Sequence, residues 1–214
     1  MSGSVASRDV EIGDHRLGGI LARPPDAGGL IIFAHGSGSS RFSPRNTFVA
    51  ETLQRRGFAT LLFDLLTETE ARTRRNVFDI PLLGSRVAEV ISWARDDPET
   101  RDLAIGLFGA STGAAAALVA AASMPEAVQA VVSRGGRPDL AGKALFKARA
   151  PTLLIVGGRD YEVISLNEEA KAMMTCPVRL AVVPGATHLF EEPGTLEQVV
   201  DLAAAWFSKH LRTA

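Results

Sequence analysis

Gly109-Ala110-Ser111-Thr112-Gly113 is the stretch that decides the fold of this chain. It reads G-x-S-x-G, which is typical of a sharp turn between a strand and a helix that exposes a nucleophilic serine. Residues 103–108 before it are short and apolar, as a buried strand should be. Residues 114–120 after it are rich in alanine, the strongest helix former. The pattern therefore predicts a serine hydroxyl exposed at the edge of a sheet, followed by a helix whose first N–H group can face an oxyanion.

The G-x-S-x-G pattern requires an acid and then a histidine later in the chain. An apolar run at 151–157 leads to Asp160, and a second run at 178–183 leads through a turn to His188. Both candidates follow the carboxyl end of a predicted strand, where open α/β sheets place their ligands. A lone G-x-S-x-G can be a glycine-rich turn and no more, but three matches in order are far more specific. We therefore predict that Ser111, Asp160 and His188 are catalytic.

Each partner of the serine has an alternative interpretation. Asp160 could cap the helix that follows it, in which case Asp139, one strand earlier, is the second choice for the acid. His188 could be a surface histidine, although no other histidine fits the order. We interpret His35 as structural support for the loop after its strand, because it precedes the serine. Asp64 also ends a strand, and we interpret it as a loop-stabilising carboxylate.

Composition fits one ordinary globular unit. The chain has 214 residues, of which 46% are hydrophobic and 22% charged, so we expect a single domain over residues 1–214 with 1–8 flexible. The net charge of −1 gives no global attraction to nucleic acid or to an anionic membrane. No apolar stretch is long enough to span a bilayer, and residues 1–7 lack the basic and apolar segments of a signal peptide. We therefore expect a cytoplasmic protein without nucleic-acid or membrane partners.

Cysteine and histidine usage argues against metal chemistry. Cys176 is the single cysteine, so no intrachain disulfide can form, and we expect a buried or partly buried thiol. The four histidines are scattered along the chain and lack the spacing of a zinc site. We expect neither a metal nor a cofactor.

The predicted elements alternate between strands and helices. One or two edge strands are expected in 10–23, with a turn at 13–14, and buried strands at 30–34, 59–63, 103–108, 128–132, 151–157 and 178–183. Helices are expected at 44–56, 78–96, after the serine, around 164–174 and at 193–211, and a loop at 65–76. Such alternation predicts an α/β fold with a mainly parallel sheet covered by helices on both faces. The dozen or so residues between Pro138 and Pro151 leave no room for a lid domain.

Taken together, the sequence resembles the α/β-hydrolase superfamily over essentially the whole chain, and its small lid-less form resembles the dienelactone hydrolase family. The phrases that carry the finer resemblance are H-G-S-G-S-S-R-F-S-P-R-N at 35–46, F-G-A-S-T-G-A-A-A-A at 108–117 and S-R-G-G-R-P-D-L at 133–140. They are similar to bacterial hydrolase domains sometimes fused to a phosphoribosyltransferase domain. Dienelactone hydrolases proper use a cysteine nucleophile where this chain has Ser111, which implies general ester hydrolysis.

The expected reaction is therefore cleavage of a small-molecule carboxylic ester through an acyl-enzyme. His188 would act as general base for Ser111, and Asp160 would orient the imidazole. The backbone N–H groups of Ser37 and Thr112 would bind the oxyanion. A thioesterase or another acyl hydrolase could use the same residues, and a non-catalytic binding protein on a hydrolase fold is the alternative outside enzymes.

Four arginines fall on loops that should border one cleft. Arg41 and Arg45 follow the predicted oxyanion loop, and Arg134 and Arg137 follow the strand after the serine. Guanidinium groups in such a cluster would suit a small anionic substrate. The alternative is surface solvation, or pairing with acids such as Glu191 and Glu192. Both interpretations stay open at the level of sequence, as does the oligomeric state.

Overall fold

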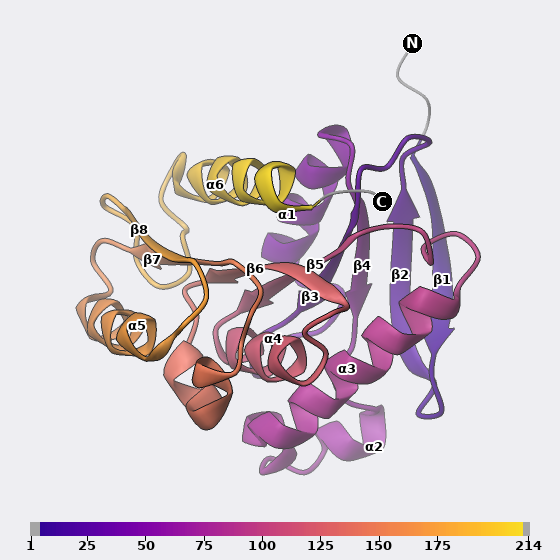
Figure 1. Ribbon diagram of the computed structural model, residues 1–214, viewed down its shortest axis with the longest axis horizontal. Coiled ribbons are helices and arrows are strands. Elements are labelled where there is room, and N and C mark those ends of the chain that lie inside the picture. The colour runs from indigo at the N-terminus through magenta and orange to yellow at the C-terminus, as the bar shows by residue number, and fades with distance from the viewer. Residues whose placement is uncertain (1–4, 212–214) are drawn as a thin grey trace.

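The computed structural model describes residues 5–211, and these form one eight-stranded sheet with helices on both faces (Figure 1). The strand order is β1-β2-β4-β3-β5-β6-β7-β8. β1 and β2 pair antiparallel, β2 pairs antiparallel with β4, and all later pairs are parallel. The predicted α/β fold with a mainly parallel sheet is confirmed.

The strands occupy nearly the predicted positions. Their bounds are β1 Ala6–Ile12, β2 Leu17–Arg23, β3 Leu30–Ala34, β4 Ala59–Phe63, β5 Ile105–Ala110, β6 Val128–Arg134, β7 Thr152–Gly157 and β8 Val178–Val183. Every residue of β3, β4, β5 and β7 is buried. Strands covered on both faces read as continuous apolar runs, which is why the sequence revealed them.

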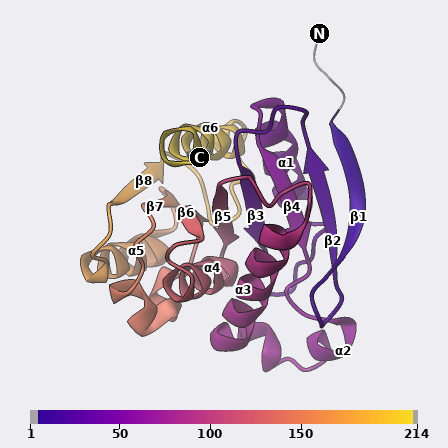
Figure 2. The same cartoon turned by 45° about the vertical axis from the view of Figure 1, so that its right-hand side comes forward.

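The helices form two layers around the sheet. α1 Pro44–Arg55 and α6 Thr195–His210 cover one face, and α3 Ile80–Asp96, α4 Thr112–Ser123 and α5 Tyr161–Met173 cover the other (Figures 1 and 2). Alternate residues of one strand serve both layers: Leu30 and Ile32 pack with the α3 and α4 side, whereas Ile31 packs with the α1 and α6 side. The sheet is therefore packed between two hydrophobic cores, one on each face. Residues at the ends of its strands are held in place by this packing.

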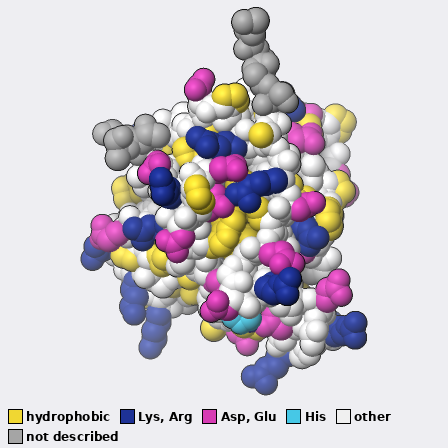
Figure 3. Space-filling view, turned by 90° about the vertical axis from the view of Figure 1, so that its right-hand side faces the viewer, with side chains coloured by type: hydrophobic (Ala, Val, Ile, Leu, Met, Phe, Trp, Pro, Cys, Tyr) yellow, Lys and Arg dark blue, Asp and Glu magenta, His cyan; other side chains and the backbone are white. Residues whose placement is uncertain are grey.

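The β1 edge is protected by charge. Arg8, Asp9 and Glu11 are exposed on β1, while Val10 and Ile12 point into the core. Figure 3 shows basic and acidic side chains interspersed on the face of the molecule that carries this edge. Charges on an edge strand oppose pairing with a second sheet. Of the segment 1–8 that was expected to be flexible, residues 6–8 belong to β1 and pair with β2, and residues 1–4 lie outside the described range.

The expected loop at 65–76 contains one short helix and ends where a second one begins. α2 Glu68–Ala71 begins with a capping box in which the Thr67 hydroxyl accepts from the Glu70 N–H and the Glu70 carboxylate accepts from the Thr67 N–H. The 3-10 helix η1 Asn76–Phe78 then leads into α3. Poor hydrophobic periodicity hid α2, but Thr67-Glu68-Thr69-Glu70 is the S/T-x-x-E signal of a helix start.

The segment after β6 is compact. It forms the 3-10 helix η2 Pro138–Phe146, which packs against α4 and α5. Its buried residues, Pro138, Ala141 and Leu145, attach it to the body of the domain. No lid domain is inserted here, in agreement with the prediction.

The fold generates a prediction about Gly113, in the first turn of α4. A Cβ atom at this residue would lie 2.2 Å from the Ala34 carbonyl oxygen and 2.4 Å from that of His35, and backbone cannot move aside cheaply. Gly113→Ala should therefore lower the free energy of unfolding by about 2 kcal/mol or more. Gly28→Ala is the matched control, because its nearest contact would be 3.8 Å away. Urea denaturation measures both, and equal midpoints would contradict the close approach.

Candidate active site

Ser111 lies at the turn between β5 and α4 in a conformation that few non-glycine residues adopt. Its φ is 51° and its ψ −123°. Three backbone hydrogen bonds hold this turn: the Ser111 N–H donates to the Arg134 carbonyl (3.3 Å), and the Ser111 carbonyl accepts from Ala114 (3.1 Å) and Arg137 (3.0 Å). Strained backbone at a residue with reactive chemistry is a mark of a functional site.

The two glycines of the G-x-S-x-G pattern are required by close packing. A Cβ at Gly109 would lie 2.4 Å from the Ala114 Cα, and one at Gly113 would meet the backbone of the loop after β3. Gly36 of that loop faces the serine: a Cβ there would lie 3.1 Å from the Ser111 Cβ. Small residues thus let helix, strand and loop converge around the Ser111 hydroxyl, as the pattern predicted.

Asp160 and His188 form a hydrogen-bonded pair. The His188 Nδ1 lies 2.6 Å from the Asp160 Oδ2, across 28 positions of sequence. Asp160 stands at the N-cap position of α5, yet its side chain makes no capping hydrogen bond there. The alternative reading of Asp160 as a helix cap therefore has no support in the structure. A carboxylate on Nδ1 fixes a histidine with Nε2 available to accept a proton.

Ser111 and His188 approach the same turn at the end of β6. Gly135 follows Arg134, the hydrogen-bond partner of the Ser111 N–H, and a Cβ at Gly135 would lie 3.7 Å from the His188 Cε1. Within residues 5–211 no hydrogen bond joins the Ser111 hydroxyl to the imidazole. Such bonds are often long in free enzymes and tighten when substrate binds.

The turn that carries His188 is supported by Glu192. Its carboxylate accepts from the Thr187 N–H at 3.1 Å, and hydrogen bonding to Thr187 lowers the pKa of the Glu192 carboxyl. Phe190, buried below the turn, has a φ of 55°. The sequence suggested Glu192 only as a possible partner of an arginine. Its position four residues after His188 was the one signal that it could support the histidine turn.

The two predicted oxyanion donors lie together, in an arrangement that the sequence did not reveal. The Ser37 N–H donates to the Thr112 hydroxyl at 2.9 Å. Thr112 is the first residue of α4, and the first N–H groups of a helix have no partner within the helix. The Thr112 side chain therefore ties the loop after β3 to the turn after Ser111. An oxyanion at this point would compete with the Thr112 hydroxyl for the Ser37 N–H.

His35 has the structural role expected of it. Its Nδ1 lies 2.9 Å from the Gly36 carbonyl oxygen, and its Nε2 accepts from the Leu65 N–H at 3.1 Å. This pair of contacts assigns the proton to Nδ1. Burial lowers the pKa of His35, so the ring is neutral at pH 7. It is a brace between the loop after β3 and the loop after β4.

The two other strand-end acids are bound to arginines. Asp139 accepts two hydrogen bonds from Arg137, at 2.9 and 2.7 Å, and this pairing raises the pKa of Arg137. Asp64 accepts from the Arg41 N–H at 2.7 Å and also pairs with the Arg41 guanidinium. Asp139 is therefore paired with Arg137 and makes no hydrogen bond to His188. Asp64 stabilises the loop after β3, as expected.

The four arginines do not form one free cationic cluster. Arg41 and Arg137 are paired as described, and Arg45 pairs with Glu191 at 3.1 Å. The sequence left two interpretations open, and for these three residues pairing with acids is what the structure shows. Their charges are neutralised locally, so the interpretation as an anion site loses its support.

Arg134 differs from the other three because it is buried, with 8% of its surface exposed. Its Nη2 donates to the Asn46 side chain at 3.3 Å, whereas its Nε and Nη1 have no hydrogen-bond partner within residues 5–211. Burial, reinforced by the charge of Arg45, lowers its pKa to about 10. The side chain is a buried cation below the strand end that supports Ser111.

The described residues offer no metal site, no membrane-spanning helix and no reactive thiol. Within residues 5–211 no group of three or more histidine, cysteine or acidic side chains could hold a metal ion, and no helix is long and apolar enough to cross a membrane. Cys176 is buried next to Thr152, at the opposite end of β7 from the site, and burial raises the pKa of its thiol. A thiol in that state is a poor nucleophile.

A cavity of about 710 Å³ opens beside the predicted oxyanion loop. Gly36, Ser37 and Thr112 line it at one end. The rest of its wall comes from the β1–β2 turn, the loop after β4, α2 and the start of α3. Ser111, Asp160 and His188 are not among its lining residues. The cavity therefore adjoins Gly36 and Thr112, the immediate neighbours of Ser111, on the side away from the acid and the histidine.

Comparison with known proteins places the chain in a family. The family described as "Alpha/beta hydrolase domain" matches residues 27–208. Among curated proteins, one from Mycobacterium tuberculosis H37Rv, named "Putative phosphoribosyl transferase", is 59% identical over 208 residues. That alignment covers 95% of this chain and 47% of the relative, so the chain spans about half the length of the curated protein it matches.

Solved structures agree with the family match. A dienelactone hydrolase from Anabaena variabilis is 54% identical, with a TM-score of 0.94 over 99% of this chain and 100% of that one. Est1E from Butyrivibrio proteoclasticus shares the fold at 17% identity, with a TM-score of 0.77 over 95% of this chain and 98% of that one. The chain is thus a member of the α/β-hydrolase family, of the dienelactone hydrolase type.

Proposed function

We propose that the protein is a serine hydrolase that cleaves carboxylic esters through a covalent acyl-enzyme. The observation that carries the proposal is the 2.6 Å hydrogen bond between Asp160 and His188 at the strand ends beside the turn that exposes Ser111. A serine hydroxyl is a weak nucleophile at neutral pH and needs a base to remove its proton. An imidazole held through Nδ1 by a carboxylate meets that need.

In the proposed first half-reaction, the Ser111 Oγ attacks the acyl carbon while the His188 Nε2 takes the serine proton. The carbonyl oxygen becomes an oxyanion, and the N–H groups of Ser37 and Thr112 donate hydrogen bonds to it. Asp160 stabilises the imidazolium. The tetrahedral intermediate then collapses, the bond to the alcohol oxygen breaks, and His188 returns the proton to that oxygen.

In the second half-reaction, water replaces the alcohol. His188 takes a proton from the water molecule, whose oxygen attacks the acyl carbon of the ester formed with Ser111. Collapse of the second tetrahedral intermediate breaks the bond to Ser111, and the proton returns to the serine oxygen. The products are a carboxylic acid, an alcohol and unchanged enzyme.

Replacement of the nucleophile tests the proposal most directly. Ser111→Ala should lower kcat for p-nitrophenyl acetate by at least about three orders of magnitude, because the proposed acyl-enzyme forms on the hydroxyl that this substitution removes. Ser123→Ala, at the other end of α4, is the matched control and should keep its rate. A fluorophosphonate probe should add its mass to the wild type and not to Ser111→Ala. Labelling elsewhere, or full activity in Ser111→Ala, would disprove the mechanism.

The assignment of the acid can be tested with two equivalent substitutions. Asp160→Asn keeps the shape of the side chain but stabilises the wrong imidazole tautomer, so kcat should fall by about four orders of magnitude. Asp139→Asn should change kcat by less than about threefold, because its carboxylate binds Arg137 and does not contact His188. Measurement of kcat for both variants shows which of the two aspartates is the catalytic acid. A larger loss in Asp139→Asn than in Asp160→Asn would reverse the assignment.

A further inference from the structure

We propose that the cavity beside the oxyanion loop binds the acyl group of the substrate, and that this group is an uncharged apolar chain or ring. The inference rests on the proposed ester hydrolysis and adds to it the substrate class and the side of the site on which each half of the ester lies. It depends on three features: the lining of the cavity, the pairing of the charges around it, and its position relative to His188.

The cavity has the size and lining of a site for an apolar ligand. Its volume of about 710 Å³ falls within the roughly 300–1,000 Å³ typical of small-molecule sites. Its apolar wall is formed by Leu17 of β2, Leu65 and Leu66 after β4, Val77 of η1 and Leu83 of α3. Their side chains come from four separate segments, so the lining is a product of the fold and not of one loop.

Of the ionisable side chains that line the cavity, only Glu68, exposed on α2, lacks an ion pair or hydrogen bond among the described residues. Arg41 is paired with Asp64, and Arg16 at the rim pairs with Glu11 at 2.8 Å. His35 uses both ring nitrogens in hydrogen bonds and is neutral. An anionic acyl group would meet no unpaired cation in this wall and one unpaired carboxylate, at a high desolvation cost. The wall therefore favours an uncharged group over an anionic one, and its leucine and valine side chains favour an apolar one.

The position of His188 determines which half of the ester faces the cavity. His188 must return its proton to the leaving oxygen, so the alcohol has to lie on the His188 side of Ser111. The cavity lies on the other side, where Gly36, Ser37 and Thr112 line it and His188 does not. The acyl group is the part of the ester that extends in this direction. On the His188 side the neighbouring residues Tyr161 and Leu189 are exposed, which leaves room for varied alcohols.

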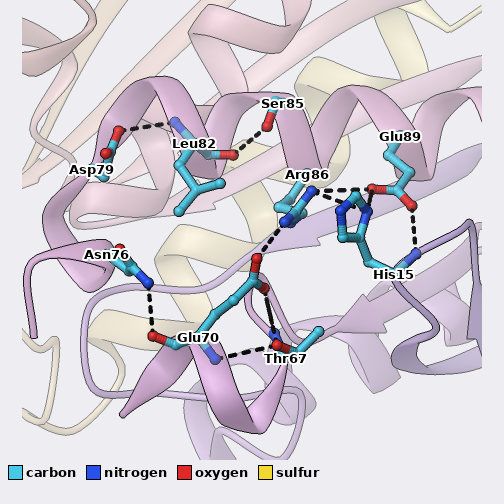
Figure 4. A network of polar contacts seen from close by, with 9 residues as sticks. All are labelled: His15, Thr67, Glu70, Asn76, Asp79, Leu82, Ser85, Arg86 and Glu89. Carbon is cyan, nitrogen blue, oxygen red and sulfur yellow. Dashed lines mark hydrogen bonds and ion pairs between the residues drawn. The ribbon is translucent and has the colours of Figure 1, made fainter. Parts of the chain in front are cut away.

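A polar network fixes two walls of the cavity relative to α3 (Figure 4). Arg86 of α3 pairs with Glu70 of α2, and its Nη1 lies 3.0 Å from the Nδ1 of His15 in the β1–β2 turn. Glu89 of α3 also holds His15, with 2.7 Å between the carboxylate and Nδ1. Burial tends to raise the pKa of Glu70, but hydrogen bonds from Thr67 and Arg86 outweigh it and lower the pKa. The network therefore joins α2 and the β1–β2 turn, which both line the cavity, to α3.

Two isomeric esters test the orientation. Ethyl hexanoate and hexyl acetate have the same atoms and nearly the same hydrophobicity, but only the first carries its long chain on the acyl side. Each methylene group buried in an apolar pocket gains about fourfold in binding. We expect kcat/KM for ethyl hexanoate to exceed that for hexyl acetate by on the order of a hundredfold. Equal values, or a preference for hexyl acetate, would overturn the proposal.

Filling the cavity tests the location. Ala71 of α2 lines the cavity and is exposed, so Ala71→Trp should occupy part of the space. The ratio of kcat/KM for p-nitrophenyl hexanoate to that for p-nitrophenyl acetate should fall at least about tenfold. Val77→Trp fills the same space from η1 and should act likewise. Ala172→Trp, an exposed alanine on α5, is the matched control and should leave the ratio unchanged; a fall in the control alone would contradict the location.

A binding measurement separates the cavity from the chemistry. Hexanamide carries the acyl group and is uncharged, and the Ser111→Ala protein needs no turnover to bind it. Calorimetry should show hexanamide bound at least about tenfold more tightly than acetamide, with the difference lost in Ser111→Ala/Ala71→Trp. Equal affinities for the two amides would overturn the cavity assignment. Tight binding of hexanamide by a protein whose wild type cleaves no ester would instead reject ester hydrolysis and retain the acyl-binding cavity.

Discussion

Ser111 holds a φ of 51° because the surrounding backbone leaves it no other conformation. Its N–H is bound to the Arg134 carbonyl and its own carbonyl accepts two hydrogen bonds, one from Ala114 and one from Arg137. Such strain costs roughly 1–3 kcal/mol. Three hydrogen bonds of about 1 kcal/mol each can offset it. Packing and backbone hydrogen bonds thus fix the turn that carries the Ser111 hydroxyl.

Close packing around Ser111 also limits which residue types can occupy the neighbouring positions. Gly109 and Gly113 have no space for a side chain because α4, β5 and the loop after β3 meet there, and Gly36 faces Ser111 at close range. The Thr112 hydroxyl then accepts from the Ser37 N–H, so the loop proposed to stabilise an oxyanion is joined to the turn that carries the proposed nucleophile. Rigid support of this kind keeps catalytic groups within the small tolerances that a reaction requires.

The sequence predicted those features that depend on local pattern. Buried strands were found because they are continuous apolar runs. Ser111, Asp160 and His188 were predicted to be catalytic because each follows such a run in a recognisable order; the structure pairs Asp160 with His188, and the catalytic roles stay a prediction. The helix α2 was missed because hydrophobic periodicity was the criterion, although Thr67 and Glu70 carry a capping signal.

Contacts between distant residues could not be assigned from the sequence. The pairing of Arg45 with Glu191, 146 positions apart, was one of two interpretations left open, and that of Arg86 with His15, 71 positions apart, was not anticipated. The pairing of Arg137 with Asp139 is local, but only the structure shows that it withholds Asp139 from His188. Placement on neighbouring loops could suggest an arginine cluster, whereas the partner of each guanidinium depends on side-chain directions that only the folded chain defines.

Strand order explains why the two sides of Ser111 differ. The chain runs from β3 outward to β4, and later from β5 in the opposite direction through β6 and β7 to β8. Ser111 therefore lies where the order reverses, which is where open α/β sheets bind ligands. One side receives the loops after β3 and β4, with backbone donors and the apolar cavity. The other receives the loops after β7 and β8, with Asp160 and His188. The order of the strands therefore puts the proposed proton transfer and the proposed apolar recognition on opposite sides of Ser111.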